Sequence, residues 1–95
     1  MANTSNPLIE IVVKNKQNVI FNESVVALTS YNEQGVFDIL PMHENFISII
    51  KDKVIIHKKT GENYEIKLTT GVLKAADNKI NIYLGPGEIA NLDND

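Results

Sequence analysis

Apolar and polar residues alternate over short stretches of this chain, and clusters of polar turn residues separate the stretches. The alternation is clearest at 64–68 and 80–84, where every second residue is apolar. Such a period of two places successive side chains on opposite faces of a strand, so that one face can be buried. No stretch combines the length and the period of a long amphipathic helix. The pattern predicts an all-β chain.

The predicted strands are short, and turn signals recur at intervals of about ten residues. Residues 46–50 would also fit one face of a short helix, but their β-branched side chains favour a strand. Short strands at this spacing are typical of a single-domain antiparallel β-sandwich (a flattened barrel) of about 8–10 short strands. The intervals between the predicted strands include breaks at 22–23, 51–53 and 69–71. The predicted strands themselves cover 8–13, 19–21, 24–31, 35–40, 46–50, 54–59, 64–68, 72–76 and 80–84.

The two ends of the chain differ in composition from the region between them. Residues 1–7 are polar and end in a proline, which predicts a flexible leader. Residues 8–84 hold the alternating stretches and form the predicted domain. Gly85-Pro86-Gly87 then interrupts regular structure, so we expect residues 85–95 to form an acidic tail.

The stretch Gly35–His43 has the features of a short strand between a turn and a corner. Glycine at position 35 suits a backbone with positive φ or a close approach by another segment. Pro41 has no N–H for a sheet ladder, so strand pairing should weaken or end there. His43 follows this corner directly, and we expect its ring to hydrogen-bond a loop carbonyl. That structural role is compatible with a contact to a partner.

Composition and charge narrow the possible functions. The chain has 95 residues, 43% of them apolar and 22% charged, which is typical of one soluble globular domain. It contains no cysteine, so a disulfide framework and thiolate chemistry are excluded, and the composition fits the cytosol. The first six residues lack the features of a signal peptide, and no apolar run is long enough for a membrane span. All nine basic residues are lysine and residues 1–84 are formally neutral, which argues against nucleic-acid binding.

Candidate catalytic and metal-binding residues are few. His43 and His57 are the two histidines, and no cluster of histidine and cysteine has the spacing of metal ligands. His57 lies within a predicted strand, where an exposed or edge side chain is the ordinary role. Glu62 and Glu65 lie beside a turn and suit a solvated face better than an acid–base pair. The sequence predicts no catalytic residue, no cofactor and no metal.

Several segments occur in an order that forms a recognisable pattern over residues 8–84. The matching segments are Ile9–Val13, Phe21, Gly35 with Ile39-Leu40-Pro41 and His43, Thr70-Gly71-Val72-Leu73, and Asn78–Leu84. This order resembles the N-terminal β-sandwich domain of the epsilon subunit of F-type ATP synthases, whose mitochondrial counterpart is called delta.

The resemblance implies a non-catalytic central-stalk (rotor) subunit that joins the gamma subunit to the membrane c-ring and couples proton flow to ATP synthesis. One flank of the sandwich would pack against gamma. The turn Asn32–Val36 and the corner Pro41–His43 would form a docking end for the c-ring and the foot of gamma. The implied partner-binding residues are Glu33, Val36, Met42 and His43, and the implied structural residues are Gly35, Pro41 and Gly71.

A rotor role also implies a location. The chain would be peripheral at the cytoplasmic face of the inner (cell) membrane, would be cytoplasmic when unassembled, and would contact the membrane only through partner subunits. The resemblance leaves open whether H+ or Na+ is the coupling ion.

The sequence departs from the family pattern at three places. Val36 stands where the family often has glutamate, and Met42-His43-Glu44-Asn45 replaces the usual Gly-His-Ala-Pro. Lys51-Asp52-Lys53 replaces a Lys-Pro-Gly turn. The C-terminal helical hairpin of bacterial epsilon subunits is missing from the sequence, so we expect neither nucleotide binding nor self-inhibition.

The alternative function is a stand-alone β-sandwich protein-interaction module derived from the same fold. An enzyme ranks third, because a fold alone assigns no activity and the sequence shows no catalytic site. Co-purification of gamma and c-ring subunits from the native membrane would distinguish the rotor subunit from the stand-alone module.

Overall fold

The computed structural model describes residues 7–85 and 91–92. These residues form eight strands with their connecting turns, and they contain no helix. Within these residues there is accordingly no helix that could cross a membrane. The all-β prediction is confirmed. The strands are β1 (Ile9–Lys14), β2 (Val19–Val25), β3 (Ala27–Asn32), β4 (Gly35–Ile39), β5 (Phe46–His57), β6 (Asn63–Ala76), β7 (Lys79–Leu84) and β8 (Asn91–Leu92).

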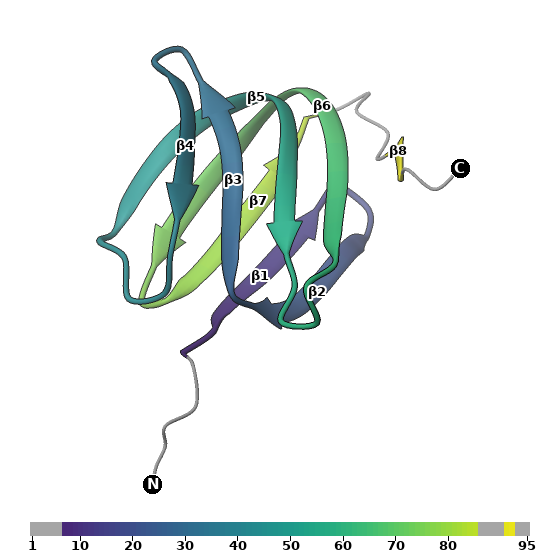
Figure 1. Ribbon diagram of the computed structural model, residues 1–95. Helices are drawn as coiled ribbons and strands as arrows, with labels where there is room; N and C mark the ends of the chain where they lie inside the picture. Colours follow the sequence, from purple (N-terminus) through teal and green to yellow (C-terminus); the bar gives the residue numbers. More distant parts are fainter. Residues whose placement is uncertain (1–6, 86–90, 93–95) are drawn as a thin grey trace, which may run out of the picture.

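Two long strands, β5 and β6, connect the two layers of the sandwich (Figure 1). They pair along their whole length and bend near their middle, so each contributes one half to each layer. The strand order is β2-β1-β7-β6-β5-β3-β4, and β8 pairs with β6. We call the layer with β1, β2 and β7 the first layer and the layer with β3 and β4 the second layer. All ladders are antiparallel except that between β1 and β7, which is parallel.

The bend lies where the sequence predicted breaks at 51–53 and 69–71, and that prediction is wrong. Lys51 pairs with Thr70 but Asp52 pairs with Leu68, so β6 holds one extra residue at this point. Such a bulge bends a strand without ending it. The extra residue also exchanges the two faces of β6, which interrupts the alternation in the sequence although the strand continues.

Gly71 lies just past this bulge and is packed tightly. A Cβ at this position would lie 2.8 Å from Leu68 Cδ1 and 3.1 Å from the backbone oxygen of Tyr83 on β7. Only a residue without a side chain lets β7 approach the bend this closely. The structural role expected for Gly71 therefore has a steric basis.

The predicted break at 22–23 is also wrong, because β2 runs through both residues. Asn22 and Glu23 pair with Val12 and Ile11 of β1, and their own side chains are exposed. Polar residues on an exposed strand face mimic a turn signal in the sequence. The chain instead bends at Val26, between β2 and β3.

The core lies between the two layers and is almost wholly aliphatic. Full burial of one such side chain contributes about 1.5–3 kcal/mol. The single buried polar residue among those described, Ser30, donates its hydroxyl to the backbone oxygen of Lys53 at 2.9 Å. The largest fully buried side chains are Ile9, Ile11, Leu28, Ile39, Ile50, Ile56, Ile66, Leu73, Ile80 and Ile82.

The predicted terminal segments lie mostly outside the described residues. This holds for 1–6 of the expected leader and for 86–90 and 93–95 of the expected acidic tail. Of the remaining tail, Asn91 and Leu92 form β8 beside Lys67 and Ile66 of β6.

Candidate partner-binding surfaces

The four residues predicted to bind partners lie at opposite ends of β4. The β3–β4 turn holds Glu33 with Val36 next to it, whereas Met42 and His43 follow the far end of the strand (Figure 1). The five residues of β4 separate these ends by roughly 15 Å at about 3.4 Å per residue. The expectation that turn and corner form one docking end is therefore wrong in its geometry. The predicted length of the strand between the turn and the corner already argued against a single docking end.

The β3–β4 turn is held to the body of the sandwich by Asn32. Its side-chain oxygen accepts the backbone N–H of Gln34 at 2.8 Å, and its side-chain nitrogen donates to the hydroxyl of Ser48 on β5 at 3.2 Å. Gly35 has φ of +116°, as the sequence predicted, and a Cβ there would meet nothing within 4 Å. The backbone conformation therefore requires this glycine. Glu33 and Val36 are exposed at the tip.

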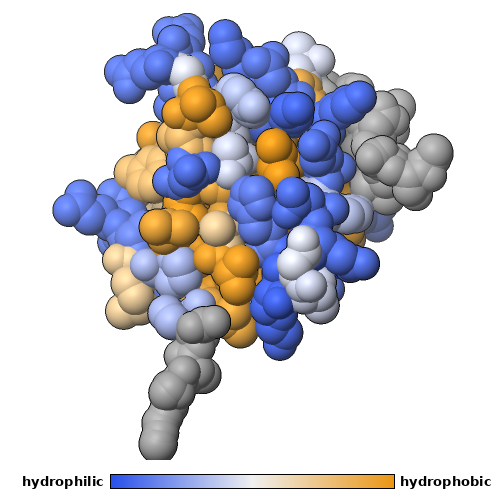
Figure 2. Space-filling view, viewed as in Figure 1, coloured by the Kyte–Doolittle hydropathy of each residue, from blue (hydrophilic) through white to orange (hydrophobic). Residues whose placement is uncertain are grey.

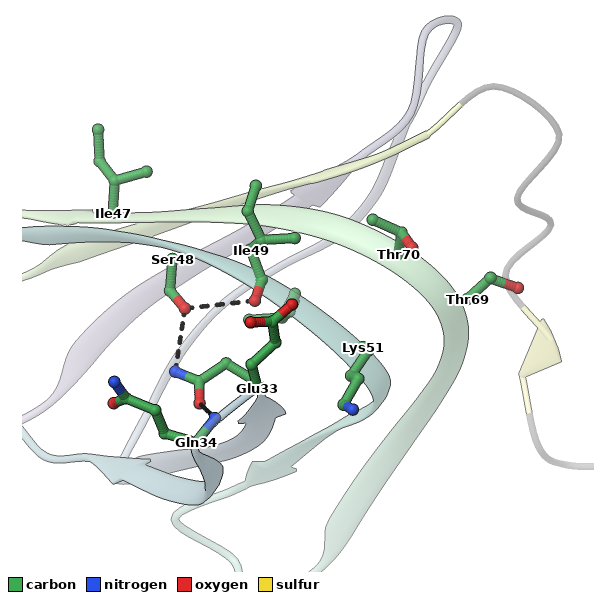
Figure 3. A pocket seen from close by; sticks show the side chains of 10 residues that line it. Glu33, Gln34, Ile47, Ser48, Ile49, Lys51, Thr69 and Thr70 are labelled. Carbon is green, nitrogen blue, oxygen red and sulfur yellow. Dashed lines mark hydrogen bonds between the residues drawn. The ribbon is translucent and has the colours of Figure 1, made fainter.

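A shallow hollow of about 580 Å³ lies between this turn and the bend of β5 and β6 (Figure 3). Figure 3 shows Glu33 and Gln34 on the turn side and Ile47 and Ile49 projecting from β5. The hollow mixes carboxylate, ammonium, amide and apolar groups, which suits contact with another protein surface better than catalysis. Its lining consists of Asn32, Glu33, Gln34, Ile47, Ser48, Ile49, Ile50, Lys51, Thr69 and Thr70.

The corner at the other end of β4 is clamped by Asn78 in the β6–β7 turn. Asn78 accepts the backbone N–H of Met42 at 2.9 Å and donates its side-chain amide to the backbone oxygen of Leu8 at 2.7 Å. In the same region Asn45 accepts the backbone N–H of Asp77 at 3.1 Å. β4 ends at Ile39, before Pro41, as predicted. The sequence indicated only a turn at Asn78, so its role as a clamp was missed.

His43 fixes the shape of this corner. Its Nδ1 lies 2.8 Å from the backbone oxygen of Glu44, and because a carbonyl only accepts, Nδ1 carries the proton. The ring packs against the ring of Phe46 in a T-shaped arrangement with a centroid distance of 6.4 Å. The predicted hydrogen bond to a loop carbonyl is confirmed. Its Nε2 is buried and has no hydrogen-bond partner among the described residues.

An apolar row on the outer face of the first layer was missed by the sequence analysis. The strand registers align Ile49 with Val72, Val72 with Tyr83, and Tyr83 with Lys14. The three apolar side chains are 61%, 36% and 41% exposed, and the Lys14 ammonium lies 5.0 Å from the Tyr83 ring centroid. We call Ile49, Val72 and Tyr83 the apolar row. Contiguous exposed apolar side chains of this kind mark sites of contact with other proteins.

The outer face of the second layer carries a polar chain of four side chains. Thr29 donates its hydroxyl to Asp38 at 2.6 Å, and its oxygen lies 2.8 Å from Nε2 of His57. The other ring nitrogen of His57 lies 3.0 Å from the side-chain oxygen of Asn63. These contacts cross β4, β3, β5 and β6. The sequence analysis expected an exposed or edge side chain at His57, and the structure shows a half-buried link between neighbouring strands.

Figure 2 shows the side of the molecule that is turned to the viewer in Figure 1. Apolar surface gathers over β4 on the left, and hydrophilic surface covers the paired halves of β5 and β6 on the right.

Within the described part of the chain, no three His, Asp or Glu side chains are placed to hold a metal ion.

The fold and these surfaces define a β-sandwich domain with an exposed apolar row on its first layer. The family model of the ATP synthase, Delta/Epsilon chain, beta-sandwich domain matches residues 9–85. The chain therefore belongs to the ATP synthase delta/epsilon family.

Two curated relatives carry the name ATP synthase epsilon chain. That of Geobacter sulfurreducens is 28% identical over 71 residues, which are 75% of this chain and 51% of the relative. That of Geobacter metallireducens is 27% identical over 71 residues, with the same coverage. The chain thus spans about half the length of the curated relatives that it matches.

Solved structures share the fold at low sequence identity. A chain of the Euglena gracilis mitochondrial ATP synthase (OSCP/F1/c-ring) superposes with a TM-score of 0.75 and 17% identity, covering 87% of this chain and 53% of that chain. A chain of the Tetrahymena thermophila mitochondrial ATP synthase (central stalk/c-ring) gives a TM-score of 0.65 and 14% identity, covering 81% and 63%.

Proposed function

We propose that this chain is a non-catalytic central-stalk subunit of an F-type ATP synthase, which joins the gamma subunit to the c-ring and couples proton flow to ATP synthesis. Family membership supports this proposal, as do two ATP synthase structures that contain a chain of the same fold, one titled OSCP/F1/c-ring and the other central stalk/c-ring. The observation that carries it is the apolar row, because an exposed apolar strip on a family member of this kind calls for a partner that covers it.

In this proposal the apolar row packs against gamma. Ile49, Val72 and Tyr83 extend over three neighbouring strands, so a partner can bury them together. Lys14 and Lys74 lie beside the row and would form a charged rim around an apolar centre. This arrangement of an apolar core with a polar rim is typical of protein interfaces.

The two ends of β4 would serve different partners. The β3–β4 turn, with Glu33 and Val36, would face the polar loops of the c-ring. The corner with Met42 and His43 would face the foot of gamma. Both loops are tied to the sandwich by side-chain hydrogen bonds from Asn32 and Asn78, which suits contacts that must transmit force without deforming.

The role requires a domain that rotates as one body. β5 and β6 run through both layers without a break, so the layers share two continuous strands. The proposed place is the cytoplasmic face of the cell membrane, with membrane contact only through partner subunits. Catalysis would belong to other subunits of the complex.

Affinity purification of the tagged chain from native membranes tests this function. Gamma and c-ring subunits should co-purify with the wild-type chain. They should be depleted with Val72→Glu, which alters the apolar row without changing the core. Recovery of a partner that belongs to no ATP synthase would instead favour the stand-alone interaction module. A wild-type eluate without gamma would contradict the proposal.

A further inference from the structure

One strand edge of the sandwich has no neighbour among the described residues. The first half of β5, residues 46–50, pairs with β6 on one side, and β3 meets β5 only from Lys51 onward. The hydroxyl of Ser48 in this segment accepts a hydrogen bond from the side-chain nitrogen of Asn32 at 3.2 Å and donates to the backbone oxygen of Ile49 at 3.4 Å. The edge thus presents backbone groups that another strand could pair with.

The other edges of the sheet are protected against such pairing. β2 carries Asn22 and Glu23 on its exposed positions. β4 has only five residues, includes Asp38 and is followed by a proline corner. The first half of β6 carries charged side chains at Glu65 and Lys67 and pairs with β8. Charges, short length and cover are the usual means by which sheet edges avoid unwanted partners.

The edge of β5 is as short as β4, but it lacks the charges, the proline and the cover that protect the other edges. The segment Phe46-Ile47-Ser48-Ile49-Ile50 contains neither charge nor proline, and three of its five residues are β-branched isoleucine. Ile47 is 66% exposed. A sequence of this kind pairs readily with a further strand. The lack of protective features therefore indicates that this edge binds a further strand.

Two hollows flank this edge, one at each end. The first is the 580 Å³ hollow beside the β3–β4 turn, and the second, of about 450 Å³, lies around Phe46 and Ile47. Lys51 lines the first hollow and Lys74 lines the second. Neither lysine forms an ion pair with another residue in the described ranges.

We propose that the 46–50 edge of β5 accepts one extended segment of another protein, which adds a strand to the first layer. Backbone hydrogen bonds would supply affinity, and the two hollows would take side chains at alternate positions of the added strand. The segment that fits has β-branched or other apolar residues at alternate positions and a carboxylate that reaches Lys74. This inference goes beyond the rotor function, because it concerns the backbone edge of β5, although Ile49 also belongs to the apolar row and Lys74 lies beside that row.

The test selects binders from a display library of random linear peptides of about twelve residues, long enough for one strand with flanks. The isolated wild-type chain is the target. Enriched peptides should show alternating apolar residues with an aspartate or glutamate, and should shift the amide NMR signals of 46–50. A proline in the middle of an enriched peptide should abolish binding, since it removes a ladder donor.

Two pairs of variants connect the binding to the edge. Ile47→Lys should weaken peptide binding by at least about tenfold, whereas Val19→Lys, at a valine of β2 with 58% exposure, should change it less than about twofold. Lys74→Glu should weaken binding by several-fold, and Lys59→Glu in the β5–β6 turn should not.

Three outcomes would overturn the proposal. They are a selection without enriched peptides, amide shifts confined to other strands, and a concentration-dependent dimer in sedimentation that Ile47→Lys dissociates, which would assign the edge to a second copy of the chain. None of them depends on whether the chain assembles with gamma.

Discussion

The two outer faces of the sandwich share the strands β5 and β6, but their side chains are satisfied in different ways. On the second layer, Asp38, Thr29, His57 and Asn63 contact one another across four strands. On the first layer, the apolar row is left to solvent. A face whose polar groups already bond each other gains little from a partner, whereas burial of exposed apolar surface is favourable. We therefore regard the apolar row as the binding site on the first layer, and the polar chain as a self-sufficient part of the second layer that is separate from the apolar surface over β4.

The largest expected effect comes from a charge in the apolar row. Val72→Glu should weaken binding to gamma by about 2–4 kcal/mol, because the carboxylate would be buried in an apolar contact. The free energy of unfolding should change by less than about 0.5 kcal/mol, since the side chain is already partly exposed. Titration of gamma and chemical denaturation of the variant measure the two quantities. Val36→Glu at the β3–β4 turn is the control and should leave gamma binding intact.

The bend that separates the two faces should be sensitive to side-chain volume. Gly71→Ala should lower the free energy of unfolding by about 1–3 kcal/mol, because the added methyl group meets Leu68 and the backbone of Tyr83. Urea denaturation checks this value. An unchanged midpoint would mean that the two layers can shift apart at no cost, which contradicts the tight packing at the bend.

A change in the polar chain should affect stability and not assembly. His57→Ala should lower the free energy of unfolding by about 0.5–1.5 kcal/mol, because Thr29 and Asn63 each lose a partner. Binding to gamma should stay as in the wild type. If His57→Ala reduced gamma binding as strongly as Val72→Glu does, the distinction between the faces would fail.

The smallest effect is expected at the loops. Met42→Ala should weaken assembly by about 0.5–1 kcal/mol without a change in stability, since its side chain is exposed and only its backbone is clamped by Asn78. Competition between variant and wild-type chains during assembly on stripped membranes would resolve such a difference. Equal incorporation would remove Met42 from the docking surface.

The sequence predicted the fold class and most strands, because alternation reports which face of a strand is buried. It missed the continuity of β6, because a bulge exchanges the faces of that strand and looks like a break. It missed the continuity of β5, because Lys51-Asp52-Lys53 resembles a polar turn. The turn at Gly35 and the hydrogen bond of His43 were predicted, since each depends on local geometry. The apolar row was not, because Ile49, Val72 and Tyr83 become neighbours only through the strand registers.

The split of the predicted docking end has a similar cause. Glu33 and Met42 are close in sequence, but the strand between them is extended and places them at opposite ends. The sequence predicted a turn before this strand and a corner after it, but did not give their relative position. Which partner each loop meets stays a prediction.

Photo-crosslinking on native membranes tests the central claim most directly. A photoreactive amino acid would replace Val72 on the first layer in one variant and Glu65 on the second layer in another. We expect a covalent adduct with gamma from position 72 and none from position 65. Adducts with gamma from position 65 alone, or from both positions equally, would contradict the assignment of the apolar row as the binding site.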